Sequence, residues 1–196
     1  MPLVYASWNV FRRGPQILYT ILYSIYKRLA IAGGSMGGTI EIQHALPEHL
    51  NELSGLFASV IQRLDIYSDD ACREEMLKFS PGKLALRLAD DPRSVELAFV
   101  GRTIVGFLIT EFQSGPIWIH WYGVHQASRR CGVGEAMLQH LIATAPSRGA
   151  TRIWCDTRTS NVQSIALLQK LNFHRLCELK NHWHHQDYFL WSRDLF

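Results

Sequence analysis

The stretch SRRCGVGEAM, Ser128–Met137, sets two adjacent arginines before two closely spaced glycines and leads directly into an amphipathic run. Gly132 and Gly134 lack a Cβ, so the backbone can come close to a ligand. A helix that begins here directs free N–H groups outward, and its dipole favours an anion. Arg129 and Arg130 can add charge-assisted hydrogen bonds to phosphate oxygens. The stretch therefore indicates either a phosphate cradle or a tight turn from a strand into a helix. It lacks the features of a Walker A loop and of the dinucleotide fingerprint.

Regular elements surround this stretch on both sides. Alternating apolar residues predict strands, and apolar residues at helical spacing predict helices. The expected strands are residues 39–45, 94–100, 103–113, 117–125, 151–157, 174–180 and 187–195. The expected helices are residues 47–65, residues 68–80 up to an interruption at Pro81-Gly82, a run from the glycine stretch to Pro146, and residues 160–173. This order predicts an α/β (α+β) fold, with a mixed sheet of about seven strands and helices on both faces.

The first 38 residues differ in character from residues 39–196. They hold four of the 20 basic residues and no acid, which leaves 16 basic against 17 acidic residues elsewhere. Residues 39–196 thus give no electrostatic argument for nucleic-acid binding. The apolar run before Lys27-Arg28 has about ten residues, whereas a membrane span needs roughly 20.

Three interpretations of residues 1–38 follow from this pattern. The segment could form a basic amphipathic helix that lies on a membrane surface or on the domain itself. It could instead lie upstream of a true start at Met36, just before the first expected strand. A cleavable secretory signal fits poorly, because a charged pair follows the apolar run. We therefore treat residues 1–38 as an extension and residues 39–196 as the folded domain.

Cysteine usage bears on the compartment. The chain has four cysteines and no CxxC pair: Cys72, Cys131, Cys155 and Cys177. Wide spacing of this kind indicates reduced thiols in a cytoplasmic protein rather than disulfides or a zinc site.

Two motifs beside the glycine stretch indicate a family. The strand HWYGVH, residues 120–125, followed by RRCGVGEAMLQHLI, residues 129–142, resembles the GNAT superfamily of acyl-CoA-dependent N-acyltransferases. A second motif of that superfamily, Asn-x-x-Ala-x-x-Leu-Tyr-x-x-x-Gly-Phe, is similar to NVQSIALLQKLNF, residues 161–173. The resemblance covers residues 39–196 and implies a GNAT-like, mostly antiparallel sheet.

The resemblance also implies a cosubstrate and its contacts. It assigns the phosphate to the pyrophosphate of acetyl-CoA, bound by the backbone around Arg130–Gly134, with the main chain of Val124 beside the pantetheine arm. Asn161 would hydrogen-bond the coenzyme, although Asn161 or Ser160 equally suits a helix N-cap. The implied cofactor-binding residues are Tyr122, Val124, Arg129, Arg130, Gly132, Val133, Gly134 and Asn161.

The chain departs from the family pattern at two positions in the second motif. Asn172 replaces a glycine, a change that asparagine tolerates at a helix end. Leu168 stands where the family often has a tyrosine that protonates the leaving thiolate. Tyr188 on the last strand could replace that phenol, or it could be an ordinary strand aromatic.

A base is useful because amines are largely protonated at neutral pH. Four residues of the fourth strand are expected to share one face: Trp118, His120, Tyr122 and Val124. His120 lies near the expected acetyl group, and its ordinary pKa near 6.5 suits proton removal. We predict His120 as the catalytic base, with Glu111 as a lesser candidate; the alternative is a partly buried histidine hydrogen-bonded within the sheet.

Three histidines lie between the last two strands: His182, His184 and His185. His-x-His-His is no standard zinc spacing, so we expect no metal. The resemblance makes this hairpin a wall of the acceptor site, together with Trp183. A solvated turn is the alternative.

Together these observations predict an N-acetyltransferase. It would move an acetyl group from acetyl-CoA to a primary amine, either a small molecule or a protein amino group, by direct attack in a ternary complex. An acyl-enzyme on Cys155 is not favoured, because no histidine and acid accompany it in sequence. The alternative function is a non-catalytic acyl-CoA-binding module, which Leu168 motivates. We expect a cytoplasmic protein without nucleic-acid partners, with membrane contact only through residues 1–38, and a homodimer is possible.

Overall fold

The computed structural model describes residues 38–64 and 66–196. The interpretations of the extension concern residues that lie outside this range, apart from Gly38, and they stay predictions.

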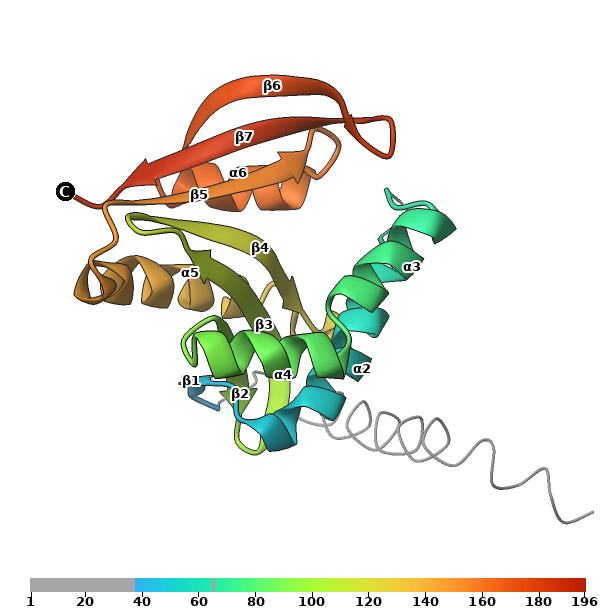
Figure 1. Ribbon diagram of the computed structural model, residues 1–196, viewed down its shortest axis with the longest axis vertical. Coiled ribbons are helices and arrows are strands. Elements are labelled where there is room, and N and C mark those ends of the chain that lie inside the picture. The colour runs from blue at the N-terminus through green and yellow to red at the C-terminus, as the bar shows by residue number, and fades with distance from the viewer. Residues whose placement is uncertain (1–37, 65) are drawn as a thin grey trace, which may run out of the picture. The chain divides into compact units, whose positions relative to one another are not determined.

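One seven-stranded sheet, with strand order β1-β2-β3-β4-β5-β7-β6, forms the centre of the described part (Figure 1). The strands are β1 (Ile40–His44), β2 (Val95–Val100), β3 (Thr103–Phe112), β4 (Pro116–Val124), β5 (Arg152–Arg158), β6 (His174–Trp183) and β7 (Gln186–Asp194). The helices are α2 (Leu50–Ile61), α3 (Asp69–Lys78), α4 (Pro81–Asp90), α5 (Val133–Thr144) and α6 (Val162–Lys170). Short 3₁₀ turns cover Pro47–His49, Gln126–Ser128 and Ala145–Arg148.

The predicted fold class is confirmed. Every neighbouring pair of strands is antiparallel except β4 and β5, which run parallel. That parallel ladder joins residues 116–119 to residues 152–155. Beyond Ile119 and Cys155 the two strands no longer pair, so the sheet is open at this end.

Two hydrophobic cores lie on opposite faces of the sheet. Helices α2 and α4 and the end of α3 cover one face, where Phe57, Phe79 and Phe107 pack together. Helices α5 and α6 cover the other face, where Leu138 and Leu168 are fully buried. Burying a side chain of this size contributes about 1.5–3 kcal/mol. Helices on both faces were predicted from the element order, and Figure 1 shows them there.

Local signals explain where the helices begin and end. The Ser68 hydroxyl accepts a hydrogen bond from the Ala71 N–H and caps α3. Pro81 opens α4, which confirms the expected interruption. Helix α5 ends at Thr144, and Pro146 lies in the following 3₁₀ turn, as predicted.

Some element boundaries differ from the prediction. The first helix begins as a 3₁₀ turn and ends at Ile61, short of the expected residue 65. Strand β5 continues to Arg158, and β6 continues to Trp183 because Trp183 pairs with Gln186 of β7. These extensions add polar residues to the sheet, and the sequence pattern had predicted loops at those positions.

The expected alternation along β4 is wrong. It placed four residues on one face: Trp118, His120, Tyr122 and Val124. A β-bulge interrupts the strand, because residues 109 and 110 of β3 pair with Trp121 and Ile119, which leaves His120 as the extra residue. The ring of His120 therefore faces Phe79 in the core beneath α2, whereas the end of β4 packs on the core beneath α5.

Two further properties of the described residues concern membrane-spanning helices and cysteines. Among residues 38–64 and 66–196, no helix has the length and apolar character needed to cross a membrane. The four cysteines are free thiols, with Cys72 and Cys155 buried and Cys131 and Cys177 exposed.

Candidate active site

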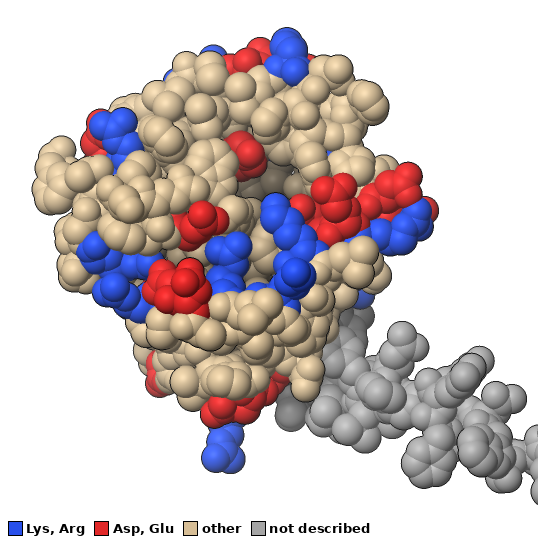
Figure 2. All heavy atoms as spheres, in the orientation of Figure 1, with Lys and Arg blue, Asp and Glu red and all other residues tan. Residues whose placement is uncertain are grey.

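Two adjoining hollows lie where β4 and β5 part. The larger, the α5 groove, has a volume of about 570 Å³ and contains all eight predicted cofactor-binding residues: Tyr122, Val124, Arg129, Arg130, Gly132, Val133, Gly134 and Asn161. The smaller, the β5 pocket, has a volume of about 280 Å³ and contains His120. Five residues line both hollows: Tyr67, Trp121, Tyr122, Asn161 and Ser164. Figure 2 shows a hollow in this face of the molecule, with acidic and basic side chains around it.

The N-terminus of α5 forms one end of the groove. Gly132 precedes the helix with φ of 82°, a left-handed conformation that favours glycine. The first backbone hydrogen bond of the helix runs from the Ala136 N–H to the Gly132 carbonyl, and no side chain of residues 38–64 or 66–196 caps this end. The preceding N–H groups therefore have no helical partner, and together with Arg129 and Arg130 they suit an anionic ligand.

The open edge of β4 forms the floor of the groove. Because β5 pairs only with residues 116–119, the β5-facing edge of residues 122–124 has no strand partner in the described chain. The Val124 carbonyl accepts a hydrogen bond of 3.4 Å from Arg129 Nε, which ties the arginine to the strand. An extended ligand with amide groups could lie along such an edge.

Asn161 lies where the two hollows meet. Its Oδ1 accepts a hydrogen bond of 3.2 Å from the Ser164 N–H, which confirms the N-cap alternative for this residue. A contact with the coenzyme stays a prediction. Ser164 itself was missed, although it occupies the alanine position of the family's second motif and was therefore visible in the sequence.

His120 and Glu111 form a hydrogen-bonded pair at the edge of the β5 pocket. His120 Nε2 lies 2.8 Å from Glu111 Oε2. Burial lowers the pKa of His120 and the bond to Glu111 partly offsets this, whereas the same bond lowers the pKa of Glu111. At neutral pH the imidazole is therefore neutral and the carboxylate ionised. A carboxylate only accepts, so Nε2 carries the proton and Nδ1 keeps the lone pair.

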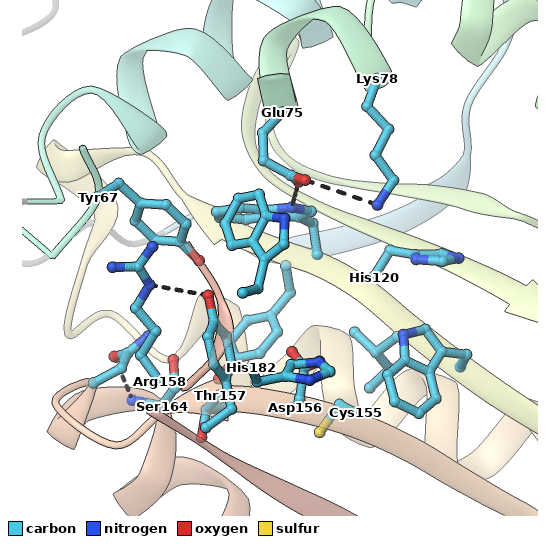
Figure 3. Close-up of a pocket in the computed structure, with 17 residues that line it drawn as sticks. Tyr67, Glu75, Lys78, His120, Cys155, Asp156, Thr157, Arg158, Ser164 and His182 are labelled. Atoms are coloured by element: carbon cyan, nitrogen blue, oxygen red, sulfur yellow. Dashed lines mark hydrogen bonds and ion pairs between the residues drawn. The ribbon is translucent and has the colours of Figure 1, made fainter. Parts of the chain in front are cut away.

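The pocket holds further charged residues that sequence reasoning missed (Figure 3). Glu75 and Lys78 come from α3, with Glu75 Oε1 3.7 Å from Lys78 Nζ. Glu75 also accepts a hydrogen bond from Trp121 Nε1. Asp156 and Arg158 come from β5. Burial raises the pKa of Glu75 and of Asp156. The signal for the β5 pair was two charges at alternate positions near the end of an apolar strand.

The last hairpin closes the pocket with only part of its histidine cluster. His182 and Trp183 line the pocket, and their role as a wall of the acceptor site stays a prediction. His184 Nε2 lies 2.9 Å from Glu74 Oε2 of α3, and His185 Nδ1 lies 3.1 Å from Asn181 Oδ1. No group of three metal-ligating side chains occurs among residues 38–64 and 66–196.

Three further residues bear on the general acid and the nucleophile: Leu168 at the family's tyrosine position, the possible donor Tyr188 and the possible nucleophile Cys155. Leu168 is fully buried in the core beneath α5 and α6. Tyr188 is buried, lines the β5 pocket and accepts a hydrogen bond of 3.0 Å from Arg158 Nε. Cys155 lines the pocket, but burial strongly raises the pKa of its thiol, which opposes a thiolate nucleophile.

Comparison with known proteins identifies the class to which this fold and site belong. The Acetyltransferase (GNAT) family matches residues 62–173, more than half of the chain. The ribosomal protein bS18-alanine N-acetyltransferase of Escherichia coli (strain K12) is 30% identical over 80 residues, 41% of this chain and 54% of that enzyme. The chain thus spans about half the length of the curated relatives it matches. The chain belongs to the GNAT acetyltransferase family, a membership that supports acyltransferase activity.

Solved structures share the fold at low sequence identity. The PaiA N-acetyltransferase of Thermoplasma acidophilum in complex with coenzyme A gives a TM-score of 0.67 at 15% identity, covering 80% of this chain and 99% of that chain. The ribosomal-protein-S18-alanine N-acetyltransferase of Escherichia coli gives 0.64 at 18% identity, covering 80% and 94%. At these identities the likeness concerns the fold alone.

Proposed function

We propose that the protein transfers the acetyl group of acetyl-CoA to a primary amine in a ternary complex. One observation carries this proposal: the eight residues that the motifs assign to the coenzyme line a single groove, and that groove adjoins the pocket containing His120. A relative that acetylates an alanine of ribosomal protein bS18 supports an amine acceptor, whether a small molecule or a protein amino group.

The α5 groove suits acetyl-CoA in its chemistry. Uncapped N–H groups at the start of α5, with Arg129 and Arg130, would hold the pyrophosphate. The open edge of β4 would hydrogen-bond the pantetheine arm, and Asn161 and Tyr122 would flank the passage into the β5 pocket. The cosubstrate supplies a thioester carbonyl that an amine can attack.

The β5 pocket would handle the protons. The amine nitrogen forms a bond to the thioester carbonyl carbon, the C–S bond breaks, and the proton of the amine passes to Nδ1 of His120. Glu111 holds the imidazole through Nε2 and stabilises the cation that forms. The thiolate of coenzyme A, with a pKa near 8.5, leaves without strict need of an acid. Tyr188 lines the pocket and is a candidate donor, because Leu168 offers none.

Direct attack is favoured over an acyl-enzyme. An acyl-enzyme would need a thiolate, and Cys155 is the only cysteine among the described residues that lines the pocket. Its raised pKa keeps it protonated at neutral pH.

The experiment is a binding and turnover assay on the purified full chain. Acetyl-CoA binding is measured by calorimetry, and coenzyme A release is followed by a free-thiol assay over a panel of small amines and N-terminal peptides. Binding with turnover supports the proposal. Binding without turnover on any amine favours the alternative, a non-catalytic acyl-CoA-binding module, which Leu168 motivates. Failure to bind contradicts both. A cytoplasmic location, a homodimer and membrane contact through residues 1–38 stay predictions.

A further inference from the structure

Arg158 is a buried cation without an anionic partner in the described part of the chain. Its side chain lines the β5 pocket, and the residue is only 3% exposed. Within residues 38–64 and 66–196, no carboxylate oxygen lies within 4.0 Å of its guanidinium, and Nη2 is buried without a hydrogen-bond partner. Burying an isolated charge is strongly unfavourable unless a ligand or a neighbour compensates it. A negative charge would therefore stabilise Arg158, and the described residues supply none within 4.0 Å.

Aromatic side chains hold this guanidinium in place. Its central carbon lies 4.0 Å from the centre of the Tyr67 ring, 5.7 Å from Tyr188 and 5.9 Å from Trp183. Nε donates to the Tyr188 hydroxyl, which uses one of five donors. These rings interact favourably with the cation, but they add no full negative charge. A planar, oriented guanidinium with spare donors is suited to a carboxylate, which it can bind through two parallel hydrogen bonds.

An acid accompanies Arg158 at a fixed separation. Asp156 stands two residues earlier on β5 and lines the same pocket (Figure 3). Side chains two apart share a face of the strand and lie about 6.6 Å apart along it. The two make no ion pair, and the other charges in the pocket, Glu75 and Lys78, pair with each other. The pocket therefore presents a carboxyl group and a guanidinium from one face of β5, and neither has an ion-pair partner within 4.0 Å among residues 38–64 and 66–196.

We infer that the acceptor is an amine that also bears a carboxylate, bound with its carboxylate on Arg158 and its amino group toward Asp156. This inference rests on the proposed function and narrows it to amino acids and close analogues. An amino acid carries both charges a few bonds apart, so it can contact both residues of β5 at once. A simple amine would satisfy Asp156 but leave Arg158 unpaired.

The test uses the full chain saturated with coenzyme A and matched acceptor pairs that differ only in the carboxylate. The probes are L-phenylalanine with 2-phenylethylamine, L-leucine with isoamylamine, and L-alanine with ethylamine. Calorimetry measures binding, and with acetyl-CoA the thiol assay measures kcat/KM. In at least one pair we expect the carboxylate member to be favoured about ten- to hundredfold. Equal binding within every pair, or no binding of any carboxylate member at millimolar concentration, overturns the inference.

Arg158→Gln should bring that preference close to one, and Arg158→Lys should leave an intermediate value. Arg175→Gln is the matched control, because Arg175 is exposed on β6 and lies against Phe189 outside the pocket; it should keep the wild-type preference. An unchanged preference in Arg158→Gln contradicts the inference, since it would assign Arg158 a structural role. If Arg158→Gln no longer binds coenzyme A, the inference is tested instead by the preference for the carboxylate member in the wild-type chain and in Arg158→Lys. Failure of the wild-type chain to bind coenzyme A would instead overturn the proposed function.

Discussion

A single hydrogen bond gives His120 its proposed chemistry. Its side chain is 17% exposed, and this burial favours the neutral imidazole. The hydrogen bond from Nε2 to Glu111 favours the protonated form, so it partly offsets the effect of burial on the pKa of His120. The balance leaves Nδ1 able to accept a proton at neutral pH.

Replacing Glu111 should move the pH dependence of acetyl transfer in a defined direction. Because Glu111 raises the pKa of His120, Glu111→Gln should lower that pKa and shift the acid limb of the kcat/KM profile to lower pH. His120→Ala should lower kcat/KM by roughly 10²–10⁴-fold and abolish that limb. Glu41→Gln, an exposed acid on β1, is the control and should leave the profile in place. An unchanged profile in His120→Ala would exclude this histidine as the base.

Glu96 is a buried carboxyl on the other face of the sheet. Its Oε1 lies 3.9 Å from His44 Nδ1 and 3.7 Å from His140 Nε2, while Oε2 is buried with no hydrogen-bond partner in the described chain. Burial raises the pKa of Glu96 to about 7. The folded state thus holds this proton more tightly than the unfolded state does.

This carboxyl should make stability depend on pH. The raised pKa favours folding below the ordinary carboxyl pKa of 4.5, and that advantage is lost as pH rises through about 7. Glu96→Gln should therefore raise the free energy of unfolding relative to wild type by roughly 2–3 kcal/mol more at pH 8 than at pH 4.5. Urea unfolding at both pH values measures the difference. The same relative stability at both pH values would contradict it, and Glu41→Gln again serves as control.

At the scale of the element, β4 depends on a glycine for its packing. A Cβ built on Gly123 would lie 2.5 Å from both Cε1 and Cζ of Phe107, whose ring is fully buried. The strand therefore approaches the core beneath α2 more closely than any larger residue permits.

Gly123→Ala should destabilise the protein by about 1–3 kcal/mol, because the buried ring must move to admit the methyl group. The matched control is Gly55→Ala in α2, where a new Cβ would meet nothing within 4 Å. That change should stabilise the helix by about 0.5–1 kcal/mol. Thermal and urea unfolding of both variants measure the effects, and equal stability of the two would refute the packing argument.

The N-terminus of α5, with the two arginines before it, is the proposed phosphate-binding element. Arg129 and Arg130 should matter only for a ligand with phosphates. The double variant Arg129→Gln/Arg130→Gln should weaken acetyl-CoA binding roughly tenfold or more, with a shallower salt dependence. S-acetylpantetheine, which lacks the pyrophosphate, should bind it as well as it binds wild type. Arg102→Gln, at the exposed β2–β3 turn, is the control. An equal loss of affinity for both ligands would contradict binding of the pyrophosphate by these two arginines.

For the whole molecule, sequence patterns predicted the order of elements and one of the two hollows. The groove was predictable because most of its residues lie in two short segments, 121–135 and 161–167, which the glycine stretch and the two motifs cover. The β5 pocket was not, because Tyr67, Glu75 and Arg158 come from separate segments that only the tertiary structure brings together. The face that His120 occupies also escaped prediction, since one extra residue in β4 reverses the alternation that periodicity assumes.

The short parallel ladder between β4 and β5 also has a consequence for how the molecule opens. It is the only parallel pairing among the described strands, and residues 116–119 must meet residues 152–155 across an intervening helix. Parallel pairing is slightly less stable per residue, and closing a longer loop costs more entropy than a hairpin does. Native-state hydrogen exchange should therefore show weaker protection in this ladder than in the hairpin of β2 and β3. Equal protection would refute this order of opening. Local opening would then begin beside the gap between β4 and β5 that is proposed to admit the ligand. Bound ligand should therefore slow hydrogen exchange in this ladder more than elsewhere in the sheet.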